Sequence, residues 1–157
     1  MLTWPDLVAY VGSVHARTFE AVSLLDDDHL RWAPRPGEFT AGELALHIAN
    51  TRLMNVLTVS GGRIRYKGHT MTPGADAASI RQTLLRSSKK TITALHDADP
   101  AALIRNTRGA EIPTWRIALG GFIEHEVHHR SQLCAYLSGL GLAAPALYGL
   151  HAEDLPR

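Results

Sequence analysis

The sequence has few of the features that mark several large protein classes. Its single cysteine, Cys134, rules out a disulfide within one chain, which is typical of a reducing compartment. The net charge of +1 gives no support for a nucleic-acid partner. No run approaches the roughly 20 apolar residues of a membrane span, and the first residues, MLTWPDLVAY, lack the basic and apolar regions of a secretory signal. We therefore expect a soluble, cytoplasmic protein without a membrane partner.

Several familiar motifs are missing as well. There is no phosphate-binding loop, dinucleotide-binding fingerprint, Ser-His-Asp signature, internal repeat or low-complexity segment. What is present is an ordinary globular composition, with 45% hydrophobic and 20% charged residues over 157 positions. This length predicts one domain, residues 1–157, with a single core.

Four stretches carry helix signals, and no strand pattern is as strong. In the first, apolar residues recur at intervals of three and four from Leu7 to Leu25. In the second, Thr40 and Glu43 have the spacing of a capping box. The predicted helices span residues 4–25, 40–59, 76–98 and 113–140. We expect an all-α protein, a four-helix bundle.

The segments between these helices differ in length. Residues 61–75 form a basic, glycine-rich connection that is long for a bundle, and a crossover, a short hairpin or a lid would all account for it. We interpret it as a long crossover between the second and third helices. Residues 100–112 are expected to be irregular, and the residues after Pro145 to have little structure.

Histidines provide the main chemical signal. Three of the nine lie in HEVHH at 125–129, where His125 and His129 stand one helical turn apart, about 6 Å along the axis. His47 lies on or beside the apolar stripe of the second helix. Inward histidines on facing helices can hold one metal ion, and three of them leave a coordination position open, as in catalytic sites. The alternative is that they are structural, hydrogen-bonded histidines of the core.

Neighbouring residues are candidates for supporting roles. Gln132 and Tyr136 follow His129 on the same side of the helix, and Asn50 follows His47 by three residues, so all three could contact a ligand or substrate. Tyr136 could equally belong to the core. His128 points about 100° away from His129, and Cys134 fits a core position better than a nucleophile. The remaining histidines are expected on the surface or in loops: His15, His29, His69, His96 and His151.

The same five residues also match H-E-x-x-H, with Glu126 as the general base of a metallopeptidase. The extended form of that motif needs a glycine and a histidine where this chain has Gln132 and Ala135. A downstream glutamate ligand could only be Glu153, and no strand is predicted to hold a peptide substrate. The peptidase is therefore the weaker hypothesis.

A di-iron carboxylate bundle is a second alternative. Glu126 and His129 form one Glu-x-x-His pair, but that class needs a second pair and two further inward glutamates. The third helix has no acidic residue between Ser79 and His96. The ligand set of a di-iron site is thus incomplete.

Four sequence segments resemble the DinB/YfiT-like metalloenzyme family, the damage-inducible DinB proteins that are unrelated to the polymerase of the same name. They are LRWAPRPG at 30–37, TAGELALHIA at 40–49, HEVHHRSQL at 125–133 and YLSGLG at 136–141. The resemblance extends from the first helix to about Pro145. It implies a four-helix bundle with a long crossing connection, commonly homodimeric, whose metal is held by His47, His125 and His129. Ser131 replaces a glycine that is usual in the family, without affecting these ligands.

The resemblance also implies an activity. Characterised relatives are thiol-dependent S-transferases and a thiol-dependent isomerase that use bacillithiol or mycothiol. This implies a divalent-metal-dependent enzyme that transfers a low-molecular-weight thiol to an electrophilic small molecule. Zinc or nickel is the expected metal, and iron, manganese or cobalt also suits histidine ligands. The catalytic residues stay open among Glu126, Gln132, Tyr136, Asn50 and Arg130.

Basic residues offer one further hypothesis and its alternative. Arg130, with Arg63, Arg65 and Lys67 of the long connection, could contact an anionic thiol, or could simply be solvent-exposed charge. A non-catalytic dimeric bundle that binds a metal or small ligand remains the alternative to the enzyme.

Overall fold

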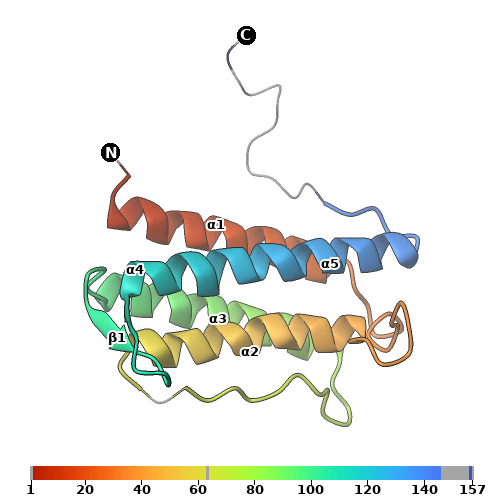
Figure 1. Ribbon diagram of the computed structural model, residues 1–157. Coiled ribbons are helices and arrows are strands. Elements are labelled where there is room, and N and C mark those ends of the chain that lie inside the picture. The colour runs from red at the N-terminus through yellow and green to blue at the C-terminus, as the bar shows by residue number, and fades with distance from the viewer. Residues whose placement is uncertain (1, 63, 146–155, 157) are drawn as a thin grey trace.

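Four long helices pack as a bundle in the computed structural model, which describes residues 2–62, 64–145 and 156 (Figure 1). The first three are α1 (Trp4–Ser23), α2 (Ala41–Val59) and α3 (Ala77–Asp97). The fourth is continuous through α4 (Thr114–Ile117), η1 (Ala118–Glu124) and α5 (His125–Gly139). The predicted four-helix bundle is confirmed. None of the helices in the described part of the chain is long and apolar enough to cross a membrane.

Each of the first three helices begins at a capping box. The side chain of Thr40 accepts a hydrogen bond from the Glu43 backbone, and the Glu43 carboxylate accepts from the Thr40 backbone in return, as predicted. Thr3 with Asp6, and Asp76 with Ser79, form the same reciprocal pairs. Two backbone donors at each start are thereby satisfied without a tertiary contact.

The order of packing explains the long connection. Helices α1 and α2 each pack against both α3 and α5, and Figure 1 shows α2 and α3 running in the same direction. The chain must therefore return along the whole of α2, whose 19 residues span about 28 Å. About nine extended residues would cover that distance. Residues 60–62 and 64–76, called here the crossover segment, are more than enough and run along α2, so the predicted crossover is confirmed.

Residues 100–112 are not wholly irregular, contrary to the prediction. Strands β1 (Leu103–Arg105) and β2 (Glu111–Pro113) pair antiparallel, with Ile104 opposite Ile112. Three residues are too few to produce a readable alternation of apolar and polar side chains, so the pattern gave no signal. At Gly109 the turn adopts a φ of 82°, a conformation that favours glycine.

Other predicted boundaries were nearly right. The first helix ends at Ser23 rather than at residue 25, although Leu25 is still buried in the core. The prediction for the residues after Pro145, including His151, lies largely outside the described residues, and so does Arg63.

The fourth helix changes its winding just before the histidines. The sequence predicted a uniform helix over 113–140, whereas residues Ala118–Glu124 are π-helical. Gly121 lies here against α2, and its carbonyl accepts a hydrogen bond of 2.9 Å from Asn55 Nδ2. A Cβ on Gly121 would lie 2.6 Å from that nitrogen, so only glycine allows this approach. A π segment shifts the angular position of every later residue, and such segments are frequent at functional sites.

Candidate metal centre

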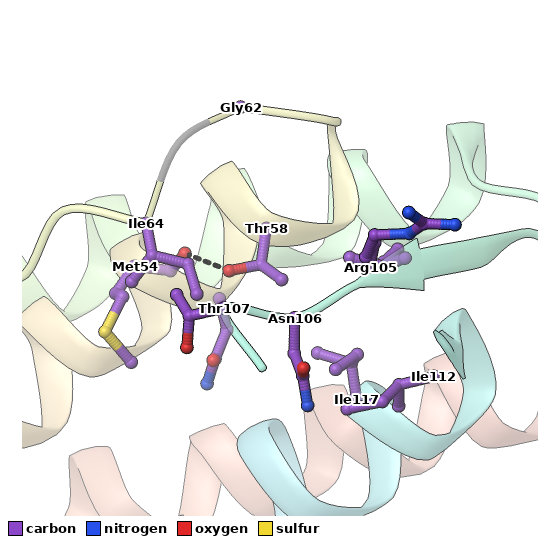
Figure 2. Close-up of a pocket in the computed structure, with 11 residues that line it drawn as sticks. Met54, Thr58, Gly62, Ile64, Arg105, Asn106, Thr107, Ile112 and Ile117 are labelled. Atoms are coloured by element: carbon purple, nitrogen blue, oxygen red, sulfur yellow. Dashed lines mark hydrogen bonds between the residues drawn. The ribbon is translucent and has the colours of Figure 1, made fainter. Parts of the chain in front are cut away.

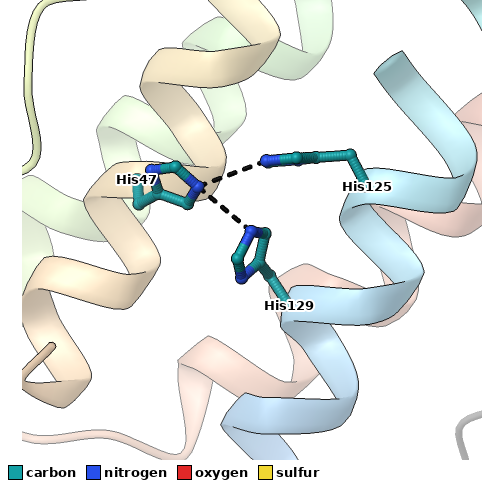
Figure 3. A group of neighbouring side chains, drawn as sticks. All are labelled: His47, His125 and His129. Carbon is teal, nitrogen blue, oxygen red and sulfur yellow. Dashed lines mark hydrogen bonds between the residues drawn. The ribbon is translucent and has the colours of Figure 1, made fainter. Parts of the chain in front are cut away.

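Three imidazoles from two helices meet at one point. His47 of α2 and His125 and His129 of α5 turn their Nε2 atoms toward each other (Figure 3). His47 Nε2 lies 3.2 Å from His125 Nε2 and 3.1 Å from His129 Nε2. All three side chains are half-buried. The sequence had proposed these three residues as one ligand set, and the fold brings them together.

The geometry fits a metal ion. Metal–nitrogen distances of about 2.0–2.1 Å in a tetrahedral arrangement put the nitrogens roughly 3.3 Å apart. The observed distances are close to this value, and the three ligand atoms lie within 4.8 Å of one another. Three nitrogen donors suit zinc, nickel, cobalt, iron and manganese, so the ligand type alone does not identify the metal.

Neighbouring side chains orient two of the rings. His129 Nδ1 lies 2.6 Å from Gln132 Oε1, an oxygen that can only accept, so the ring proton is on Nδ1 and the Nε2 lone pair faces the cluster. His47 Nδ1 lies 2.6 Å from Tyr66 Oη, which is 3.2 Å from His69 Nδ1. A chain of hydrogen bonds thus connects the crossover segment to the cluster.

The three rings are neutral at pH 7. Burial, followed by the neighbouring histidines, lowers the pKa of His47 to about 4. Burial and then His129 lower the pKa of His125 to about 4, against a smaller opposing effect of Glu126. Burial also lowers the pKa of His129, although its hydrogen bond to Gln132 acts in the other direction. A metal ion would therefore meet lone pairs and displace no protons.

The cluster offers an incomplete coordination shell. Among the described histidines, cysteines and acidic residues, only these three form a group with metal-ligand spacing. A structural zinc site has four protein ligands, whereas a catalytic site keeps at least one position for water or substrate. The half-buried rings leave that position within reach of small molecules.

Comparison with known proteins identifies the family. The model of the DinB superfamily matches residues 11–133, most of the chain. The chain belongs to the DinB superfamily. The resemblance noted in the sequence is thereby confirmed.

Solved structures agree with the DinB fold. A DinB-like protein from Bacillus cereus ATCC 10987 matches with a TM-score of 0.75 at 22% identity, covering 92% of this chain and 97% of the other. A DinB-like protein from Bacillus subtilis matches with a TM-score of 0.73 at 20% identity, covering 90% and 97%. A mycothiol-dependent maleylpyruvate isomerase matches with a TM-score of 0.59 at 12% identity, covering 91% and 62%. None of the curated proteins compared matches the sequence significantly.

Two predicted supporting residues of this DinB chain lie near the cluster, and two do not. Gln132 orients His129, and Asn50 holds the crossover segment by donating 2.7 Å to the Gly68 carbonyl. Tyr136 is buried and packs edge-on against Trp32, with ring centroids 5.4 Å apart. Arg130 is also buried, and its Nη1 donates to the Val14 carbonyl of α1 at 3.2 Å, so it is not exposed to a ligand at the cluster.

Glu126 belongs to a different site from the adjacent His125. Its carboxylate is 1% exposed and is held by Arg52, through Nε at 2.7 Å and Nη2 at 2.5 Å. Burial alone would raise the pKa of Glu126, but Arg52 in particular brings it below the usual value. A carboxylate bound in this way cannot accept a proton from water at the cluster. The arrangement therefore does not fit the general base of an H-E-x-x-H peptidase.

The expectation that His15 lies on the surface was wrong. His15 is 2% exposed, its Nδ1 is 3.0 Å from Ser88 Oγ, and its Nε2 is 3.3 Å from Glu126 without hydrogen-bond geometry. Burial, then the charge of Arg52, lowers the pKa of His15 to about 3, against the attraction of Glu126. The residue occupies an inward position of α1 that the spacing of apolar residues alone did not reveal.

Sequence reasoning missed the contribution of the crossover segment. Tyr66 was not singled out, and His69 was expected only on the surface or in a loop, yet Tyr66 contacts His47 and His69 contacts Tyr66. His69 also packs on Phe39, with ring centroids 4.2 Å apart. The length of the connection was the available signal, because loops this long in compact domains are often functional. Nothing in the local pattern indicated which of its residues would reach α2.

Proposed function

We propose that this chain is a divalent-metal-dependent enzyme that uses a low-molecular-weight thiol to attack an electrophilic small molecule. His47, His125 and His129 would hold the ion, with zinc or nickel expected and iron, manganese or cobalt compatible. The observation that carries the proposal is the convergence of three neutral, half-exposed imidazoles. Among the described residues, no fourth histidine, cysteine or acidic side chain joins this group. The fold shared with a mycothiol-dependent isomerase supports thiol chemistry.

A divalent ion held by His47, His125 and His129 would supply charge beside the open position, and this charge would lower the pKa of a thiol there so that the reactive thiolate is present at neutral pH. The thiol proton leaves to solvent, and the sulfur forms a bond to the electrophilic carbon. If that carbon bears a leaving group, the group departs with the bonding electron pair. If it belongs to a conjugated double bond, the π bond breaks and the neighbouring carbon takes up a proton.

The residues of the chain position these groups. Gln132 and Tyr66 fix the rings of His129 and His47, so that the Nε2 atoms face one another before anything binds. Arg65 and Lys67 are exposed on the crossover segment beside Tyr66, where they could attract an anionic thiol. The buried Arg130 has no part in that contact.

The metal can be tested directly. Elemental analysis of the untagged protein should give about one divalent ion per chain, lost in both His47→Ala and His129→Ala. His128→Ala is the matched control, because His128 is exposed and outside the cluster. Retention in His47→Ala would limit the site to α5, and an absence of metal in every sample after incubation with zinc and nickel would overturn the proposal.

The thiol reaction needs a second test. Consumption of electrophiles should be measured with a panel of thiols, using the metal-loaded parent and the His47→Ala variant. Turnover that needs both the metal and the thiol supports the transferase. Stoichiometric metal without turnover by any pair would favour the alternative, a non-catalytic binding bundle. The homodimer implied by the family resemblance stays a proposal, which analytical ultracentrifugation would test.

A further inference from the structure

We infer that a cavity near the β-hairpin binds the apolar body of the electrophile, so that substrates are elongated, uncharged and largely apolar. The inference rests on the proposed function. The cavity has a volume of about 560 Å³ and lies among α2, the crossover segment, the hairpin and the start of the fourth helix. This is within the range of roughly 300–1,000 Å³ usual for small-molecule sites.

Most of the lining is aliphatic. Ile64 comes from the crossover segment, Ile104 and Ile112 from the hairpin, and Ile117 from α4. Figure 2 shows Met54, Thr58 and Ile64 on one side of the space, and Arg105, Ile112 and Ile117 on the other. A cavity lined in this way gains most from excluding water around an apolar chain or ring.

Three of the elements that line the cavity also carry residues at or beside the candidate metal centre. On α2, Met54 lies seven residues after His47, and on the fourth helix Ile117 lies eight residues before His125. On α2 the separation corresponds to about 10 Å along the helix. On the crossover segment, Ile64 lines the cavity and Tyr66, two residues on, bonds to His47. A molecule with its reacting carbon at the metal centre would need to be about 10 Å long to fill the cavity.

The polar groups at the cavity favour an uncharged ligand. Asn106 uses its Oδ1 to accept from the backbone of Arg108 and Ala110, which leaves its amide Nδ2 as a donor. The guanidinium of Arg105 is 3.3 Å from the Glu111 carboxylate and mostly exposed, so its charge is already balanced at the rim. A charged thiol cofactor has better partners in Arg65 and Lys67, and we therefore assign the cavity to the electrophile.

Isoleucine methyl NMR can test the cavity without any reaction. The chain has eight isoleucines, of which Ile64, Ile104, Ile112 and Ile117 line the cavity, whereas Ile48 and Ile80 are buried in the core. Octanamide should shift the four cavity signals saturably and leave the two core signals in place. Acetamide should bind at least tenfold more weakly, since each buried methylene contributes about fourfold. No saturable shift with octanamide, or equal affinity for acetamide, would overturn the inference.

Variants of residues that line the cavity test whether octanamide binds there. Ile112→Asp puts a charge in the cavity and Thr107→Trp fills it from the exposed turn, so each should weaken octanamide binding at least tenfold. Leu103→Asp is the matched control, because Leu103 is in the same hairpin but 62% exposed and outside the cavity. Thr107→Trp keeps the test decisive if Ile112→Asp disrupts the hairpin. Unchanged affinity in a folded Thr107→Trp variant would contradict the inference.

Kinetics connect the cavity to the proposed reaction. Relative to the uncatalysed rates, kcat/KM for addition of a thiol to trans-2-dodecenal should exceed that for acrolein at least tenfold, and Thr107→Trp should abolish the preference. In this step sulfur bonds to the β-carbon, the π bond breaks and the α-carbon gains a proton. Turnover without a length preference would refute the cavity assignment and leave the proposed function standing. Octanamide binding without metal or turnover would leave the cavity standing and remove the proposed function.

Discussion

Two histidine-containing sites lie on different faces of α5, and they differ in whether their polar groups already have partners within the protein. At the metal centre, three neutral rings turn lone pairs toward one another, with no fourth member of the group among the described residues. In the other site, which we call the Glu126 network, the carboxylate of Glu126 is bound by Arg52 and lies beside the neutral ring of His15. The charges of the network are paired within the protein, whereas the neutral rings of the candidate metal centre leave lone pairs that could bind a cation. The adjacent residues His125 and Glu126 thus belong to different sites: His125 to the candidate metal centre, and Glu126 to the buried network.

The largest expected effect comes from breaking the Glu126 network. Glu126→Gln should lower the free energy of unfolding by about 3–5 kcal/mol, because Arg52 is 2% exposed and would lose the charge that compensates it. Urea unfolding of the metal-free protein would measure this. The folded variant should still bind one metal ion per chain.

A double variant tests whether the unpaired charge of Arg52 causes the loss of stability in Glu126→Gln. Arg52→Met with Glu126→Leu removes both charges, so it should recover much of the lost stability. Destabilisation by less than about 1 kcal/mol in Glu126→Gln would mean that the pair is not what stabilises this side of α5.

Removing one histidine of the candidate metal centre should weaken metal binding strongly and change the free energy of unfolding little. His125→Ala should weaken metal affinity at least 100-fold, since structural zinc sites share roughly 10–16 kcal/mol among four ligands. The half-buried ring contributes less to the core than Glu126 does, so the metal-free protein should unfold within about 1 kcal/mol of the parent. Chelator competition and urea unfolding would measure the two quantities. A lower free energy of unfolding in His125→Ala, with unchanged metal affinity, would reverse our assignment of the two sites.

The sequence was sufficient for the bundle and for the grouping of His47, His125 and His129, because both depend largely on the spacing of residues along helices. The spacing of His125 and His129 fixes their common face whatever the tertiary structure. His47 was proposed as their partner from its place on or beside the apolar stripe of the second helix, and the family resemblance implied the same residue. The role of Glu126 could not be predicted from spacing along the helix. Its place in a motif suggested catalysis, but its partner Arg52 is 74 positions away, and only the packing of α2 against α5 reveals the pair.

The crossover itself was predicted from the length of the connection, but the contacts of the crossover segment could not be, for a different reason. Its extended path along α2 follows from the parallel course of α2 and α3, which local sequence does not encode. The contact between Tyr66 and His47, and the cavity at Ile64, both depend on that path. The π segment includes the close contact between Gly121 and Asn55 of α2, a tertiary contact that the local sequence does not indicate.

Acid should affect stability mainly through the Glu126 network. The pKa of His15 is about 3 in the folded protein and about 6.5 when unfolded, so between these values the unfolded state binds more protons. Stability should therefore fall as pH decreases below 6.5, by up to about 1.4 kcal/mol per pH unit from this residue. The lowered pKa values of His47 and His125 act in the same direction, but less, because these rings are partly exposed.

The matching experiment is urea unfolding of the metal-free protein between pH 6.5 and 5, where carboxylates contribute little. His15→Gln should make the curve against pH clearly flatter than in the parent, whereas His96→Gln, on the exposed side of α3, should leave it unchanged. An equal slope in His15→Gln and the parent would show that His15 is not held neutral by burial.

The smallest expected effect connects the crossover segment to the metal centre. Tyr66→Phe removes the hydroxyl that contacts His47 Nδ1 and should weaken metal affinity about tenfold, as is usual for partners that orient a ligand. Tyr10→Phe is the control, on the exposed side of α1. If Tyr66 acts by holding the ring of His47, the loss should be in affinity and not in stoichiometry. An unchanged affinity would mean that packing against Phe39 is enough to orient His47, and that the crossover segment covers the metal centre without tuning it.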